Sequence, residues 1–97
     1  MGRPAVSFRV VWRQRVRRRL DVLTFLAGER GGSPDQIHLA VAEIDSRLAA
    51  DPSNEGESRQ GSERVLVVHP LSVTYEEFEP DRVVIIYEAV LYPRQRA

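Results

Sequence analysis

The chain contains no cysteine and no lysine, and it has no apolar run that approaches the length of a membrane helix. Without cysteine there is no disulfide, no thiol nucleophile and no thiolate zinc site. A membrane helix needs about 20 consecutive apolar residues, and the first residues of the chain lack the apolar core of a signal peptide. These absences predict a cytoplasmic protein that has no membrane partner.

The length of the chain sets a second limit on its function. A chain of 97 residues buries about 65% of its unfolded surface, which suffices for one modest core but not for a walled cavity around a large cofactor. We therefore expect a single domain over residues 1–97 and no cofactor. The two histidines, His38 and His69, are too isolated to form a metal pair, and no acidic cluster has calcium spacing. No metal site is expected.

A net charge of zero conceals a division of charge along the sequence. Residues 1–30 contain eight arginines against two acidic residues, a balance of +6, so the rest of the chain carries −6. Arg13 and Arg17 in this basic part, together with Arg59 later in the chain, are candidate nucleic-acid contacts. A solvated helix face is the simpler interpretation of the same pattern, and a partner with an acidic tail is another.

The first half of the chain shows one strand pattern and two helix patterns. Apolar and polar residues alternate over 5–12, which predicts a half-buried strand. Over 13–28 the apolar residues recur at helical spacing, which predicts an amphipathic helix. Ser33 to Gln36 has the form of a capping box, so a second helix is expected to begin there and to end before Pro52. The short connection predicts an antiparallel helical hairpin.

The second half of the chain begins with a polar segment and continues with three strand patterns. Residues 51–63 have no apolar side chain except that of one proline and are expected to form a long polar loop. The β-rich runs are 64–69, 71–78 and 82–92. The turn formers between the last two runs predict a hairpin.

The strand patterns also predict which strand lies inside the sheet. The middle run is apolar at alternate positions only, as expected when one face of the sheet is covered. The last run is apolar on both predicted faces, which indicates an interior strand; Val83, Ile85, Tyr87, Ala89 and Leu91 form one face, and Val84, Ile86 and Val90 form the other. The predicted fold is α+β in the order β-α-α-β-β-β, with the helical hairpin on one face of a mainly antiparallel sheet.

Four residues are expected to meet in this fold. Arg59 lies in the polar loop, Arg64 opens a strand, and Tyr92 and Arg94 close the last strand. Strand pairing would bring them to one sheet face or edge. The alternative is structural, because arginines at sheet edges more often cap the edge or pair with glutamates than take part in chemistry.

The second half of the chain resembles the RelE/ParE toxin superfamily of type II toxin–antitoxin modules. The resemblance covers nearly the whole chain. In the family, a strand and a helical hairpin precede a proline-bearing polar stretch, which is followed by an Arg-x-Leu strand, a strand that ends near Tyr, an acidic turn and a Val-x-Ile strand. The matching residues are 51–61, Arg64-x-Leu66, Tyr75, Asp81 and Val83-x-Ile85. Each motif is degenerate, so the resemblance depends on their order and on the independently predicted fold.

The resemblance implies two activities and a protein partner. RelE-like toxins are ribosome-dependent mRNA endonucleases (mRNA interferases) that inhibit translation, whereas ParE-like toxins inhibit DNA gyrase without cutting RNA. For cleavage, Arg64 and Arg94 would hold the phosphate, and Glu57, His69 and Tyr92 are the nearby candidates for proton transfer. The implied partners are a cognate antitoxin in either case, the ribosome and mRNA for a RelE-like protein, and gyrase for a ParE-like one. A silent member that retains only the fold is the third interpretation.

Overall fold

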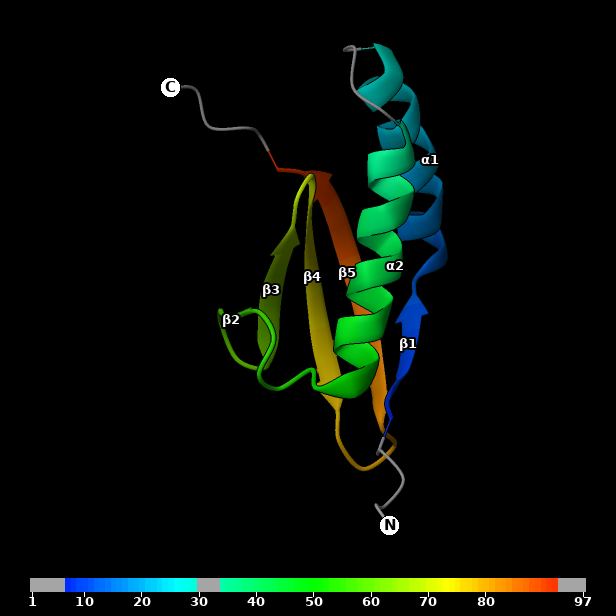
Figure 1. Cartoon of the computed structure of the whole chain (residues 1–97). Coiled ribbons are helices and arrows are strands. Elements are labelled where there is room, and N and C mark those ends of the chain that lie inside the picture. Colours follow the sequence, from blue (N-terminus) through cyan, green and yellow to red (C-terminus); the bar gives the residue numbers. More distant parts are fainter. Residues whose placement is uncertain (1–6, 30–33, 93–97) are drawn as a thin grey trace.

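The computed structural model describes residues 7–29 and 34–92, and it confirms the predicted α+β fold (Figure 1). The elements are β1 (Arg9–Trp12), α1 (Gln14–Glu29), α2 (Pro34–Ala50), β2 (Glu57–Ser58), β3 (Glu63–Val68), β4 (Leu71–Phe78) and β5 (Val83–Leu91). Both helices pack on one face of the sheet, and the opposite face, called here the open face, is covered by neither (Figure 1). No helix in this described part of the chain is long and apolar enough to cross a membrane.

The helices form where the apolar spacing predicted them. Val16 and Leu23 of α1 are buried, as are Ile37, Ile44 and Leu48 of α2. These residues repeat at helical spacing, so each helix presents one apolar stripe to the sheet. Alpha-helix α2 ends at Ala50, before Pro52, as predicted. The predicted cap at Ser33 lies outside the described residues.

The sheet has the strand order β1-β5-β4-β3-β2. Strand β5 lies between β1 and β4, so the prediction of an interior strand is confirmed. It pairs in parallel with β1 and antiparallel with β4, and the pairs β3–β4 and β2–β3 are also antiparallel. The first strand begins at Arg9, because the Phe8 amide donates to the Ala49 carbonyl at the end of α2 instead of joining the sheet; residues 5 and 6 of the predicted strand lie outside the described residues.

A bulge in β5 overturns part of the predicted alternation. Between Thr74 and Tyr75 the partners on β5 jump from Glu88 to Ile86, which leaves Tyr87 without an opposite residue. A bulge of this kind shifts all later side chains to the other face. Ala89 is therefore buried under the helices with Val84 and Ile86, and the prediction that it shares a face with Val83 and Ile85 was wrong.

The polar segment 51–63 is more ordered than a long loop. Glu57 and Ser58 form β2 and pair with Val65 and Arg64 of β3. The prediction of a loop without secondary structure was therefore wrong at this point. Sequence pattern missed the strand because it has only two residues, both of them exposed and polar.

Candidate functional site

The segment between α2 and β2 is anchored by a buried tyrosine. The Tyr75 side chain is fully buried, and its hydroxyl lies 2.8 Å from the carbonyl oxygens of both Pro52 and Glu55. The hydroxyl has one proton to donate, so the two carbonyls share it. Burial raises the pKa of Tyr75, while the nearby Arg64 lowers it. Tyr75, which matches the tyrosine of the family motif, thus fixes the path of residues 52–55 by binding two of their carbonyl groups.

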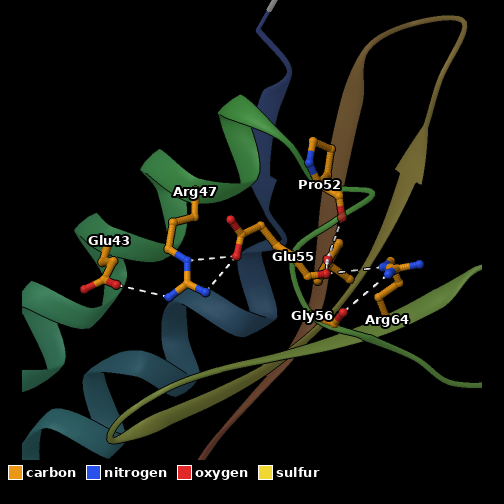
Figure 2. Close-up of polar contacts among 7 residues, drawn as sticks. Glu43, Arg47, Pro52, Glu55, Gly56 and Arg64 are labelled. Carbon is orange, nitrogen blue, oxygen red and sulfur yellow. Dashed lines mark hydrogen bonds and ion pairs between the residues drawn. The ribbon is translucent and has the colours of Figure 1, made fainter.

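Arg64 lies beside this anchor, on the helix-facing side of the sheet. It pairs across the ladder with Tyr75, so their side chains share a face. Its Nε lies 3.4 Å from the Glu55 carbonyl oxygen, and one of its terminal nitrogens lies 3.3 Å from that of Gly56. Figure 2 shows both contacts. These long hydrogen bonds tie Arg64 to the segment; a contact of its guanidinium with phosphate stays a prediction.

An ion pair joins the same segment to α2. Arg47 donates from two nitrogens to one carboxylate oxygen of Glu55, at 2.9 and 2.7 Å, and from the third to Glu43 at 3.1 Å (Figure 2). The Glu55 hydrogen bond raises the pKa of Arg47. The side chain of Glu55 thus binds α2, while its carbonyl accepts from Tyr75 and Arg64. Residues 52–56 are held from both sides, which positions the following β2.

A pocket on the open face gathers three of the predicted site residues. Its volume is about 270 Å³. Its lining is Gly56, Glu57, Arg59, Val65, Val67, Ser72 and Tyr92. Arg59 and Glu57 form an ion pair at 3.4 Å, and both side chains are more than half exposed. We call this the open-face pocket. A carboxylate, a guanidinium and a phenol therefore line one pocket, together with the apolar side chains of Val65 and Val67.

His69 follows β3 and is not part of the lining of this pocket; it lines a separate hollow beside α2, together with Gln36, Leu39 and Glu43. Its ring meets the Tyr92 ring edge to face, with centroids 6.5 Å apart. The backbone holds Tyr92 in this place, because its amide donates to the Pro70 carbonyl at 2.7 Å. Arg94 lies outside the described residues, so its predicted approach to Arg64 stays a prediction.

The predicted nucleic-acid contacts lie in three separate places. Arg59 is in the open-face pocket. The Arg13 guanidinium lies 5.5 Å from the centre of the Tyr87 ring, farther along the open face. Arg17 lines a hollow between α1 and α2, together with Asp21 and His38. The structure does not bring the three together, because β1 and β2 are opposite edges of the sheet with β5, β4 and β3 between them, and Arg17 lies between the helices.

A second polar cluster on the open face was missed by sequence reasoning. Glu76 accepts hydrogen bonds from Ser62 and from the Tyr87 hydroxyl, the latter at 2.6 Å. With Arg13 stacked on Tyr87, the cluster runs from β3 to the start of α1. In the sequence, only Tyr87 points to this cluster, because a tyrosine within a strand carries a hydroxyl that needs a hydrogen-bond partner. The alternation of apolar and polar residues does not show that this partner is Glu76.

This cluster makes the fold sensitive to acid. The hydrogen bonds from Ser62 and Tyr87 lower the pKa of Glu76. A carboxyl whose folded pKa is lowered stabilises the fold above its unfolded pKa, and this stabilisation is lost as the pH falls below about 4. We expect Glu76→Gln to lose less stability than the wild type over that acid range, measured as unfolding midpoints by circular dichroism. Glu88→Gln, the control, should follow the wild type; a parallel decline in all three would contradict the assignment.

Comparison with known proteins supports the fold. Neither a protein-family model nor a curated protein matches the chain. Among solved structures, it resembles a chain of the toxin–antitoxin complex RelBE2 from Mycobacterium tuberculosis, with a TM-score of 0.66 and 14% sequence identity. The alignment covers 93% of this chain and 97% of that one. The chain therefore shares its fold with a chain of this toxin–antitoxin complex. This agrees with the resemblance drawn from the sequence motifs.

Proposed function

We propose that this chain is the toxin of a type II toxin–antitoxin pair and that it acts as a RelE-like, ribosome-dependent mRNA endonuclease in the cytoplasm. The fold likeness supports the toxin role. The open-face pocket supports the activity, because it joins Glu57, Arg59 and Tyr92 in one place. Glu57 belongs to β2, Arg59 to the turn after it, and Tyr92 follows β5. The fold therefore places residues that are distant in the sequence around one pocket.

The pocket offers the groups that RNA cleavage without a metal requires. The carboxylate of Glu57 would accept the proton of the ribose 2′-hydroxyl, whose oxygen then attacks the phosphorus. The Arg59 guanidinium would stabilise the charge on the phosphate oxygens. The Tyr92 phenol would give its proton to the departing 5′-oxygen, with His69 beside it as the other proton carrier. Cleavage would leave a cyclic phosphate on one fragment.

A ParE-like gyrase inhibitor is the second candidate, and one observation favours it. Arg64, which the resemblance assigns to the phosphate, is turned to the helix side and hydrogen-bonded to Glu55 and Gly56. Within the described residues, the open-face pocket therefore has Arg59 as its one guanidinium, and Glu57 already pairs with it. A protein that only binds gyrase would need no further cation there.

One expression experiment tests the proposal and separates the candidates. Induction of the chain alone should arrest growth and produce new mRNA 5′ ends within translated regions, mapped across the transcriptome. Growth arrest with unchanged 5′ ends and blocked DNA supercoiling by purified gyrase would instead support the ParE-like candidate. Normal growth at full induction would contradict both and leave the silent member. Co-expression of a cognate antitoxin should restore growth and copurify with the chain.

A further inference from the structure

The turn between β2 and β3 carries Arg59 to the open-face pocket, although the side chains of this turn are not buried. Every side chain from residue 57 to residue 63 is exposed. Strand β2 adds two residue pairs to the sheet, and a hairpin of this size is marginally stable by itself. The Arg59 amide donates to the Glu63 carbonyl at 2.8 Å, and the Glu63 amide donates to the Gln60 carbonyl at 3.1 Å. Polar side-chain contacts are therefore left to decide where the turn lies.

The ion pair inside the pocket does not supply this positioning. Arg59 and Glu57 lie 3.4 Å apart, and both side chains are more than half exposed. Exposed ion pairs contribute little, because water screens both charges. Both partners also belong to the same hairpin, so their pair fixes neither of them relative to the rest of the sheet. The place of Arg59 in the pocket needs a contact that leads from the turn to another strand.

Such a contact exists at Glu76 of β4. The hydroxyl of Ser62, which belongs to the same turn, donates to one carboxylate oxygen of Glu76, and the Tyr87 hydroxyl of β5 donates to the other at 2.6 Å. Hydrogen bonds to an ionised carboxylate are about twice as strong as those between neutral groups. Glu76 and Tyr87 are half-buried, so water competes less for them than for the turn. We call these three residues the turn anchor.

The bulge in β5 makes Tyr87 available to the turn anchor. Tyr87 has no opposite residue on β4, and bulges commonly re-aim a side chain beside a functional site. The Arg13 guanidinium lies 5.5 Å from the centre of the Tyr87 ring, at a distance where a cation is attracted to the face of an aromatic ring. Arg13 thus holds the ring, and Glu76 holds its hydroxyl. The turn anchor therefore leads from the exposed turn to the interior strand β5.

We propose that Ser62, Glu76 and Tyr87 are positioning residues for RNA cleavage, which hold the turn so that Arg59 faces the phosphate in the open-face pocket. None of the three lines that pocket, so they act through Arg59 and not on the substrate. A displacement of about 1 Å is enough to cost a reacting group much of its effect. The inference rests on the proposed function, because Arg59 has a phosphate to stabilise only if the pocket cleaves RNA.

A cluster that only stabilises the sheet is the alternative, and the strand register disfavours it. Backbone pairing already joins β3 to β4 at this point, where Glu63 lies opposite Glu76. The bond from Ser62 starts one residue before β3, in the turn itself. It therefore adds little to the sheet and much to the position of the turn. Removal of the Ser62 hydroxyl separates the two interpretations.

The first measurement follows the turn and does not depend on activity. Amide hydrogen exchange is recorded by NMR on the purified full chain. Ser62→Ala should speed exchange at the Arg59 and Glu63 amides about tenfold, because both lose protection when the turn opens, while the amides of β4 and β5 should exchange as in the wild type. Tyr87→Phe, which releases Glu76 from the other side, should give a smaller change in the same direction at the same two amides.

The second measurement asks whether the turn anchor acts through Arg59. In a reconstituted translation reaction, Ser62→Ala should lower the maximal cleavage rate about tenfold and leave the half-saturating substrate concentration unchanged. The double variant with Arg59→Gln should be no slower than Arg59→Gln alone, because the hydroxyl has no other route to the substrate. Ser62→Thr keeps the hydroxyl and should restore the rate. The control, Ser46→Ala, changes an exposed serine of α2 away from the pocket and should match the wild type in both measurements.

Three outcomes would overturn the inference. One is unchanged exchange at the Arg59 and Glu63 amides in Ser62→Ala. Another is a rate loss that adds fully to that of Arg59→Gln, which would show an effect on the fold as a whole. A third is cleavage by Ser62→Thr as slow as that by Ser62→Ala. A wild type that cleaves no RNA, together with faster exchange in Ser62→Ala, would reject the proposed function but keep the turn anchor; cleavage by the wild type with unchanged exchange would do the reverse.

Discussion

Replacement of Gly56 by alanine should lower the free energy of unfolding by about 3 kcal/mol. Gly56 has a φ of 65°, which alanine adopts only with strain. An added Cβ would also lie 2.7 Å from the Val65 carbonyl oxygen and 2.9 Å from the Tyr75 hydroxyl. The first of these is backbone within the sheet, and the second is buried, so neither can move aside cheaply. The loss should appear in urea denaturation followed by circular dichroism.

Gly61 provides the matched control. Its φ of 61° is nearly the same, but nothing lies within 4 Å of the position of an added Cβ. Gly61→Ala should therefore show only the conformational strain, about 1 kcal/mol. The difference between the two variants isolates the clash with the anchor of residues 52–56. Equal losses at both positions would show that this anchor does not constrain Gly56.

The sequence was sufficient to predict the order of helices and the main strands because their burial is periodic. Ile37, Ile44 and Leu48 repeat at helical spacing, and Leu71, Val73 and Tyr75 alternate, so each pattern specifies one covered face. Two features broke the pattern. The bulge at Tyr87 changes the phase of β5, and β2 is too short to have a period.

The candidate site was predictable only in part, because long-range contacts decide which way a polar side chain points. The sequence placed Arg64 at the start of a strand. The face of the sheet on which its side chain lies follows from its pairing with the buried Tyr75, and the sequence does not specify that register. Conversely, Glu57 and Arg59 share the open-face pocket with Tyr92 because β2 forms, which the sequence did not indicate. The cluster of Arg13, Tyr87 and Glu76 depends on the bulge and had no sequence signal beyond Tyr87.

The largest effect on function is expected at the open-face pocket. Glu57→Gln removes the proposed proton acceptor while keeping the shape of the side chain, and general acid–base catalysis contributes about 100-fold or more to such reactions. Tyr92→Phe removes the hydroxyl of the proposed proton donor but keeps the ring. Each variant should reduce mRNA cleavage by about 100-fold, measured as the rate of appearance of new 5′ ends in a reconstituted translation reaction. Both side chains are largely exposed, so the fold should be unchanged.

Two comparisons make this result specific to chemistry at the pocket. Glu88→Gln, on β5, removes an exposed carboxylate that does not line the pocket, and it should cleave at the wild-type rate. Tyr92→Ala removes the exposed ring as well as the hydroxyl, and we expect that ring to contribute to RNA binding by stacking on a base. Tyr92→Ala should therefore also raise the substrate concentration needed for half-maximal cleavage, whereas Tyr92→Phe should lower only the maximal rate. A gyrase inhibitor needs neither proton. If Glu57→Gln and Tyr92→Phe arrest growth as strongly as the wild type, the pocket is a binding surface and the endonuclease assignment fails.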